Sequence, residues 1–88
     1  MNWQATETRR LAVSGSDQVE NFESLCTGVY LIADADCFVA FDENADLGSF
    51  LIKANIVYPL ERVNFTQIHA ITSGGTGNLY ILATRTSR

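Results

Sequence analysis

The chain is poor in basic residues. It has 88 residues, of which 6 are Lys or Arg and 10 are Asp or Glu, and its net charge is −4. Lys53 is its single lysine, and Arg9 and Arg10 form its single basic pair. Because no basic stripe follows from this composition, we expect no nucleic-acid partner.

Cysteine, proline and long apolar runs are also scarce. Cys26 and Cys37 are too few for a disulfide framework, so we expect two reduced, buried thiols. No apolar run is long enough to span a bilayer, and none follows the polar first ten residues as in a secretion signal, so we expect no membrane partner and no export. Pro59 cannot donate a ladder hydrogen bond, which predicts a sheet edge or bulge there.

Helical periodicity is absent, and short runs rich in β-branched and aromatic residues are present instead. Glycines and small polar residues separate these runs, as in an all-β sandwich or barrel. The predicted strands are residues 9–14, 18–23, 28–34, 36–42, 48–54, 56–63, 67–73 and 77–85. We therefore predict a single antiparallel β-sandwich domain over residues 1–88, with about eight short strands. Residues 1–8 are polar and are expected to form an extended N-terminal arm.

Several predicted strands are apolar on both faces. In the run GVYLIAD, Val29 and Leu31 point one way and Tyr30 points the other, and the last strand has the same pattern around Tyr80. A two-layer sandwich needs one apolar face per sheet, so a neighbouring subunit is the simplest cover for the second face. The alternative is that these tyrosines are single exposed aromatics, which soluble proteins tolerate.

An acidic stretch, FDENADLGSF, has the spacing of a calcium loop at Asp42, Asn44 and Asp46. Its sixth position lacks the required glycine, and its twelfth is Lys53 where a chelating glutamate belongs. We therefore predict a turn with no metal and no cofactor. A looser calcium site that includes the acidic corner at residues 33–36 is the open alternative.

Catalytic patterns are missing as well. The single histidine, His69, lies in a predicted strand, and a Cys–His pair would need one of two core-like cysteines. The sequence has no Gly-x-Ser-x-Gly elbow, and SGGTGN lacks the Gly-Lys-Ser/Thr of a phosphate loop. We expect a structural histidine, a glycine-rich hairpin turn and no enzymatic activity.

The order of these features resembles small virion proteins of tailed bacteriophages. An apolar strand and an acidic corner lead into the Cys-aromatic-Val run of residues 36–41, and a small-residue loop follows. An isoleucine-rich strand and the Gly-x-Leu-aromatic-Ile hairpin of residues 77–81 close the pattern, which covers roughly residues 28–83.

The resemblance implies a head-associated structural protein with a jelly-roll-like sandwich. Such a protein would be a capsid decoration or cement protein of the virion, assembled in the cytoplasm of the host bacterium. Its partners would be the major capsid protein and further copies of itself, with a trimer favoured. The alternatives are a carbohydrate- or receptor-binding module of a tail or fibre, and a neck or head–tail connector component. The candidate interface residues are Trp3, Arg9, Arg10, Tyr30, Tyr58 and Tyr80.

Overall fold

All the described strands belong to one antiparallel sheet. The computed structural model describes the backbone of residues 3–87 and the side chains of residues 6–85. The strands are β1 (Trp3–Val13), β2 (Gln18–Ala33), β3 (Cys37–Phe41), β4 (Phe50–Ile52), β5 (Tyr58–Ile71) and β6 (Gly77–Ser87). Their order across the six-stranded sheet is β1-β6-β2-β5-β3-β4. The described residues include no helix long and apolar enough to cross a membrane.

The all-β prediction is confirmed, but the prediction of eight short strands is wrong. Two pairs of predicted strands each merge into one long strand, β2 and β5. The reason is that the intervening residues, SLCT in β2 and NFT in β5, contain no glycine or proline to end the strand. A two-sheet jelly-roll sandwich is likewise not confirmed, since hydrogen bonding continues across one sheet.

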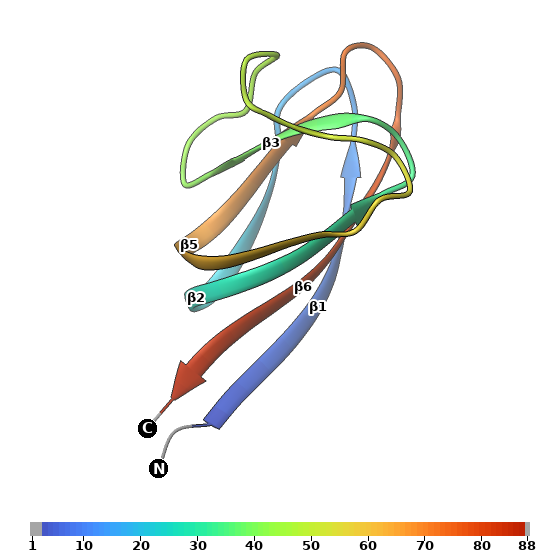
Figure 1. Cartoon of the computed structure of the whole chain (residues 1–88). Coiled ribbons are helices and arrows are strands. Elements are labelled where there is room, and N and C mark those ends of the chain that lie inside the picture. Colours follow the sequence, from blue (N-terminus) through green and yellow to red (C-terminus); the bar gives the residue numbers. More distant parts are fainter. Residues whose placement is uncertain (1–2, 88) are drawn as a thin grey trace.

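Both long strands bend in the middle. The ladder between them shifts register on either side of the pair Cys26–Phe65, which is the irregularity expected of a bulge. Arg62, just before this point in β5, has a positive φ of 61°. Figure 1 shows β2 and β5 curving round so that the sheet folds over itself. The first half of each strand therefore lies in a different part of the curl from its second half.

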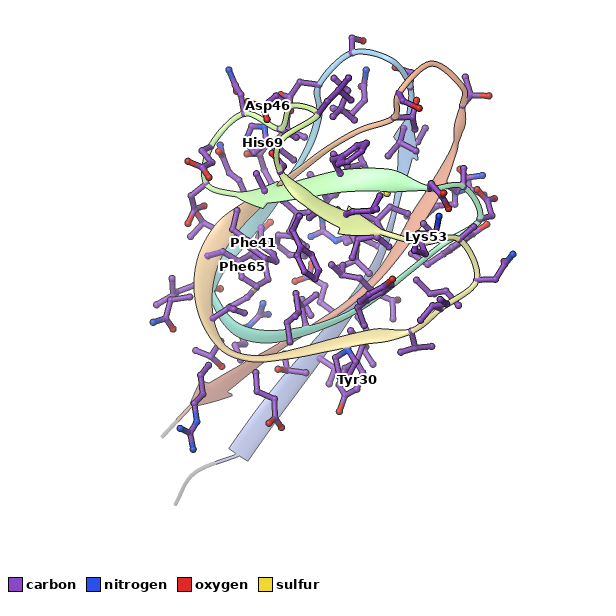
Figure 2. The ribbon with its side chains drawn as sticks, turned by 45° about the horizontal axis from the view of Figure 1, so that its top comes forward. Tyr30, Phe41, Asp46, Lys53, Phe65 and His69 are labelled. Atoms are coloured by element: carbon purple, nitrogen blue, oxygen red, sulfur yellow. The ribbon has the colours of Figure 1, made fainter. Side chains whose placement is uncertain are left out.

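The curled sheet encloses one apolar core. Buried residues from all the strands form a single cluster, and Phe65 lies within it, with its ring 5.7 Å from Phe22 and 4.8 Å from Phe41 between centroids (Figure 2). Its buried members are Leu11, Val13, Phe22, Cys26, Val29, Leu31, Ala33, Cys37, Val39, Ile52, Phe65, Ile68, Ala70, Leu79, Ile81 and Ala83. The predicted alternation in β2 and β6 is thus confirmed.

The predicted N-terminal arm is wrong for residues 3–8. These residues form the first half of β1 and pair in register with β6, from Trp3–Ser87 onward. Among them, the side chain of Glu7 points into the curl and meets the guanidinium groups of Arg9 and Arg85. Residues 1–2 lie outside the described residues.

Pro59 lies where a proline is tolerated. Its half of β5 pairs with β2. In contrast, β3 pairs through Phe38–Phe41 with the other half of β5, Ile68–Ile71. One side of the strand at Pro59 is therefore a sheet edge, as predicted.

Candidate interaction surface

An apolar surface lies on the side of β6 and β2 that faces away from the core. It comprises the side chains of Tyr30, Ile32, Val57, Tyr80 and Leu82, and we call it the outer face. Tyr30 lies opposite Leu82, and Ile32 lies opposite Tyr80 in the ladder between β2 and β6. Because opposite residues of an antiparallel pair project on the same side, these four side chains form one patch.

The outer face is exposed and slightly hollow. Tyr30 is 47% exposed, Tyr80 is 42% exposed and Val57 is 55% exposed. A shallow hollow of about 400 Å³ lies among the five side chains. Figure 2 shows Tyr30 pointing away from the core. Contiguous exposed apolar side chains of this kind typically mark an interaction site rather than ordinary surface.

Four of the predicted interface residues divide between two environments. Tyr30 and Tyr80 share the outer face, and exposed Arg10 of β1 lies opposite Tyr80 at its margin. Tyr58 instead packs on the core, meets Phe50 edge-on at 6.0 Å, and accepts a hydrogen bond from the N–H of Lys53 at 3.0 Å. The side chain of Trp3 lies outside the described residues.

Arg9 faces into the curl, where it connects β1 to β2 at one end of the core. Its guanidinium donates to Glu20 at 2.6 Å, pairs with Glu7 and lies 5.0 Å over the ring of Phe22. Arg85 donates to the other oxygen of Glu7 at 3.1 Å. Hydrogen bonds from Arg9 and then Arg85 lower the pKa of Glu7 below its ordinary value.

The sequence predictions do not include this cluster, although strand alternation contains a signal for it. Strand alternation puts Glu7 and Arg9 on the same side of β1 as the buried Leu11 and Val13. Alternation does not predict that Glu20 joins the cluster, because Glu20 reaches Arg9 only through the curl of the sheet.

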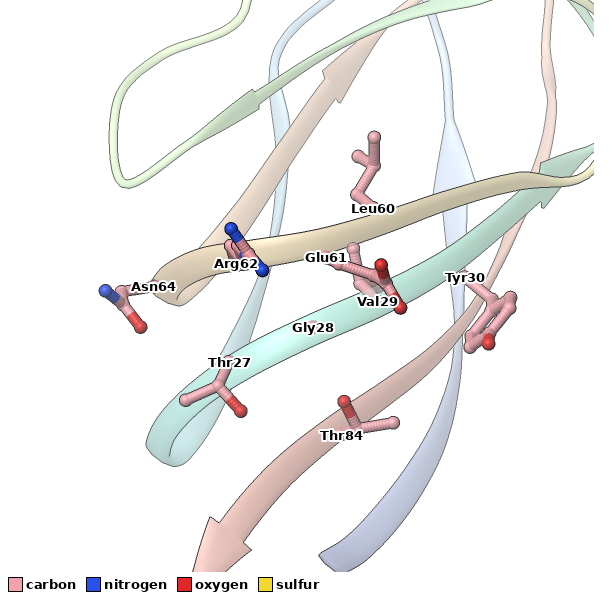
Figure 3. Close-up of a pocket in the computed structure, with 9 residues that line it drawn as sticks. All are labelled: Thr27, Gly28, Val29, Tyr30, Leu60, Glu61, Arg62, Asn64 and Thr84. Atoms are coloured by element: carbon pink, nitrogen blue, oxygen red, sulfur yellow. The ribbon is translucent and has the colours of Figure 1, made fainter.

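A polar hollow of about 450 Å³ lies beside the outer face, at the bend of β2 and β5 (Figure 3). Thr84, Glu61 and Arg62 line it, and the ring of Tyr30 borders it. Gly28 forms part of its floor, and a Cβ atom there would lie 2.8 Å from the Thr84 hydroxyl oxygen. The hollow therefore combines hydroxyl and charged groups with one aromatic ring.

His69 is buried, with both ring nitrogens in hydrogen bonds. Nδ1 lies 2.9 Å from an Asp17 carboxylate oxygen, and Nε2 lies 3.0 Å from the Gln67 amide oxygen. Asp17 also accepts the N–H of Ala45 at 2.9 Å. Burial raises the pKa of Asp17, but the hydrogen bonds from His69 and Ala45 outweigh it and lower the pKa overall. Asp17 thus links His69 of β5 to Ala45 of the acidic loop.

The aspartates of that loop accept hydrogen bonds from backbone N–H groups. Asp42 has a positive φ of 59°, and one of its oxygens accepts the N–H groups of Thr66 at 3.0 Å and Gln67 at 2.8 Å. Asp46 accepts the N–H of Gly48 at 2.8 Å, which is a side-chain turn. Among the described residues, no group of three or more His, Cys, Asp or Glu side chains is placed to hold a metal ion.

The two cysteines are free and fully buried. Burial raises the pKa of the Cys37 thiol to about 11, and burial also raises that of Cys26. Both therefore remain protonated at neutral pH and pack as small apolar side chains, because the thiolate is the reactive form.

Comparison of the chain with protein-family models and with curated proteins finds no match.

Proposed function

We propose that the chain is a non-enzymatic structural protein of a tailed-phage virion, acting as a capsid cement or decoration protein. It would form homo-oligomers and stabilise the capsid by bridging major capsid protein subunits. We further propose that the strongly bent β2 and β5 make the curled sheet equivalent to a jelly-roll-like sandwich. The proposal rests on the order of sequence features that resembles small virion proteins, and on the outer face.

The outer face is the observation that carries the proposal. A cement protein works by burying surface against its neighbours, and an exposed patch with two tyrosines suits that task. The arginine at the edge of this patch, Arg10, adds the polar rim that interfaces usually have. His69 is committed to hydrogen bonds within the fold, which favours a structural role for it.

Loss of the two tyrosines should weaken capsid binding without loss of folding. We expect the double substitution Tyr30→Ser and Tyr80→Ser to weaken co-sedimentation with purified capsids of the encoding phage by at least about tenfold, since interface tyrosines often contribute more than 1 kcal/mol each. Circular dichroism would verify the fold. Leu47→Ser is the matched control, because Leu47 is 58% exposed in the loop between β3 and β4.

Two outcomes would contradict this proposal. One is a wild-type protein that does not bind the capsids, and the other is a double variant that binds as tightly as the control. In the second case the chain could still be a virion protein, but the outer face would not be its docking surface.

A second candidate function is a carbohydrate- or receptor-binding module of a tail or fibre. The polar hollow favours it, because glycans combine hydroxyl hydrogen bonding with stacking on an aromatic ring, and Tyr30 borders Thr84 and Glu61 there. On this proposal Tyr30→Ala should abolish glycan binding and Tyr80→Ala should leave most of it. A glycan array that stays blank at millimolar ligand would refute this alternative.

A further inference from the structure

β1 is a long, regular strand at one edge of the sheet. It has 11 residues, pairs with β6 along its whole length without a register shift, and ends the strand order of the sheet. Proteins usually protect such edges with proline, lysine, bulges, short strands or inward-pointing charges, and of these β1 has only the inward charges of Glu7 and Arg9. The opposite edge, β4, has only 3 residues. Within residues 3–87, β1 is therefore the edge that most needs a cover.

The hydrogen-bond pattern identifies which groups of β1 point outward. The N–H of Asp34 donates to the carbonyl oxygen of Asn78 at 3.1 Å, so even-numbered residues of β6 bond to β2. Because bonding alternates along an antiparallel strand, odd-numbered residues of β6, such as Ile81, bond to β1 at odd positions, such as Arg9. The remaining positions of β1 direct their N–H and C=O groups to the free edge. These outward positions, whose backbone groups face the free edge, are Gln4, Thr6, Thr8, Arg10 and Ala12.

We propose that two copies of the chain join antiparallel along β1, with Thr8 opposite Thr8 of the second copy. This register is centred on the strand Trp3–Val13, so every residue of the strand is paired. It also makes outward positions face outward positions, as a hydrogen-bonded ladder requires. A two-fold contact between identical edges closes after two copies, so the product is a dimer whatever larger assembly the outer face supports.

The charges of β1 select this register. It places Glu7 opposite Arg9 of the second copy on the inner side, and Arg10 opposite the neutral Thr6 on the outer side. If one strand slid by two residues along the other, Glu7 would lie opposite Glu7 or Arg9 opposite Arg9. Like charges that are directly opposite are destabilising. A shift by one residue would oppose inner with outer side chains.

The first test is the oligomeric state of the full chain by light scattering. Thr8→Pro removes the central outward N–H and leaves the bonds to β6 in place, since those use odd positions. Thr8→Val is the matched control, because it keeps the N–H group. We expect dimers for the wild type and Thr8→Val, and a monomer with wild-type circular dichroism for Thr8→Pro. A monomeric wild type at high-micromolar concentration, or a dimeric and folded Thr8→Pro, would overturn the proposal.

Cross-linking tests the register itself and does not depend on the proline variant folding. Directly opposite residues that share hydrogen bonds have Cα atoms about 5.5 Å apart, within disulfide reach. Thr8→Cys should therefore form a covalent dimer on oxidation. Thr6→Cys alone should not, because the two Thr6 positions are four residues apart along the ladder, roughly 14 Å at about 3.4 Å per residue. The double variant Thr6→Cys, Arg10→Cys should cross-link again.

Cross-linking by Thr6→Cys and none by Thr8→Cys would refute the register. Cys26 and Cys37 do not compete, because both are fully buried. The Tyr30→Ser, Tyr80→Ser variant should cross-link through Thr8→Cys as the single Thr8→Cys variant does. Thr8 also lines the hollow of the outer face, but the ladder uses backbone groups of β1 and neither tyrosine belongs to β1. The edge dimer can therefore fail or stand independently of the proposed capsid docking.

Discussion

Close contacts at single residues fix how the turns meet the sheet. Gly77 begins β6, and a Cβ atom there would lie 2.7 Å from both the Ala35 Cβ and an Asp34 carboxylate oxygen. The N–H of the next residue, Asn78, donates to the same aspartate oxygen at 2.7 Å. The corner after β2 and the start of β6 are thus packed against each other through a position that only glycine fits.

Gly77→Ala should destabilise the protein by roughly 1–3 kcal/mol, because the new methyl group forces backbone or neighbouring atoms apart. Gly75→Ala is the matched control, since a Cβ there meets nothing within 4 Å. That variant should be neutral or stabilise by about 0.4–1 kcal/mol, because alanine restricts the unfolded chain. Urea unfolding of both variants gives the comparison. Equal stability of the two variants would show that the corner at Asp34 and Ala35 moves to accommodate the new methyl group.

At the scale of elements, carboxylates bind the loops to strand ends. Asp34, Asp36 and Asp42 each accept a backbone N–H from a distant segment. These bonds, from Asn78, Ala54 and Thr66 respectively, are the main cause that lowers the pKa of each carboxyl below its ordinary 3.8. The loops are therefore held by charged acceptors on the surface.

Acid should loosen these loops. Because each folded-state pKa is below 3.8, the unfolded chain binds protons more readily, so the contribution to stability is present above that pH and is lost as the pH falls below it. Asp42→Asn keeps the positive φ of 59° accessible but loses the charged acceptor. We expect its melting temperature to lie a few degrees below wild type near pH 7, with the gap closing toward pH 2.

Glu43→Gln removes the same charge one residue away and is the control for that experiment. A melting-temperature gap for Asp42→Asn that stays constant from pH 7 to pH 2 would contradict the assignment of its carboxylate as the acceptor.

At the scale of the whole molecule, one sheet must curl to make a core. Phe65 lies at the bend, is fully buried, and contacts aromatic rings from β2 and β3. It is among the largest fully buried side chains, and the long-range pairing of β2 with β5 passes beside it. The curl and the core therefore depend on the same residue.

Phe65→Ala should cost about 3–5 kcal/mol of the free energy of unfolding, through lost burial and the cavity left behind. That is a large part of the roughly 5–15 kcal/mol typical of a small domain, so the variant is expected to unfold readily. Phe65→Leu should cost less, about 1.5 kcal/mol or below. Denaturant unfolding measures both. A loss under about 1 kcal/mol for Phe65→Ala would mean that the bend is set elsewhere.

The sequence by itself determined the β class, the faces and the turns. Side chains alternate along any strand for steric reasons, so Val29 and Leu31 had to face one side and Tyr30 the other. The acidic corner and the glycine-rich reversal end their strands through local backbone preferences, and the structure places turns at both. Local chemistry also explains why Asp46 bonds the backbone N–H of Gly48.

Only the tertiary structure decided where the strands bend and which distant residues meet. The pairing of Arg9 with Glu20 and the contact of Asp17 with His69 both follow from the curl. The curl arises from burying one core between halves of the same sheet, which no local pattern encodes. For the same reason, alternation made Tyr30 and Tyr80 candidates, but only the register between β2 and β6 placed them on one face.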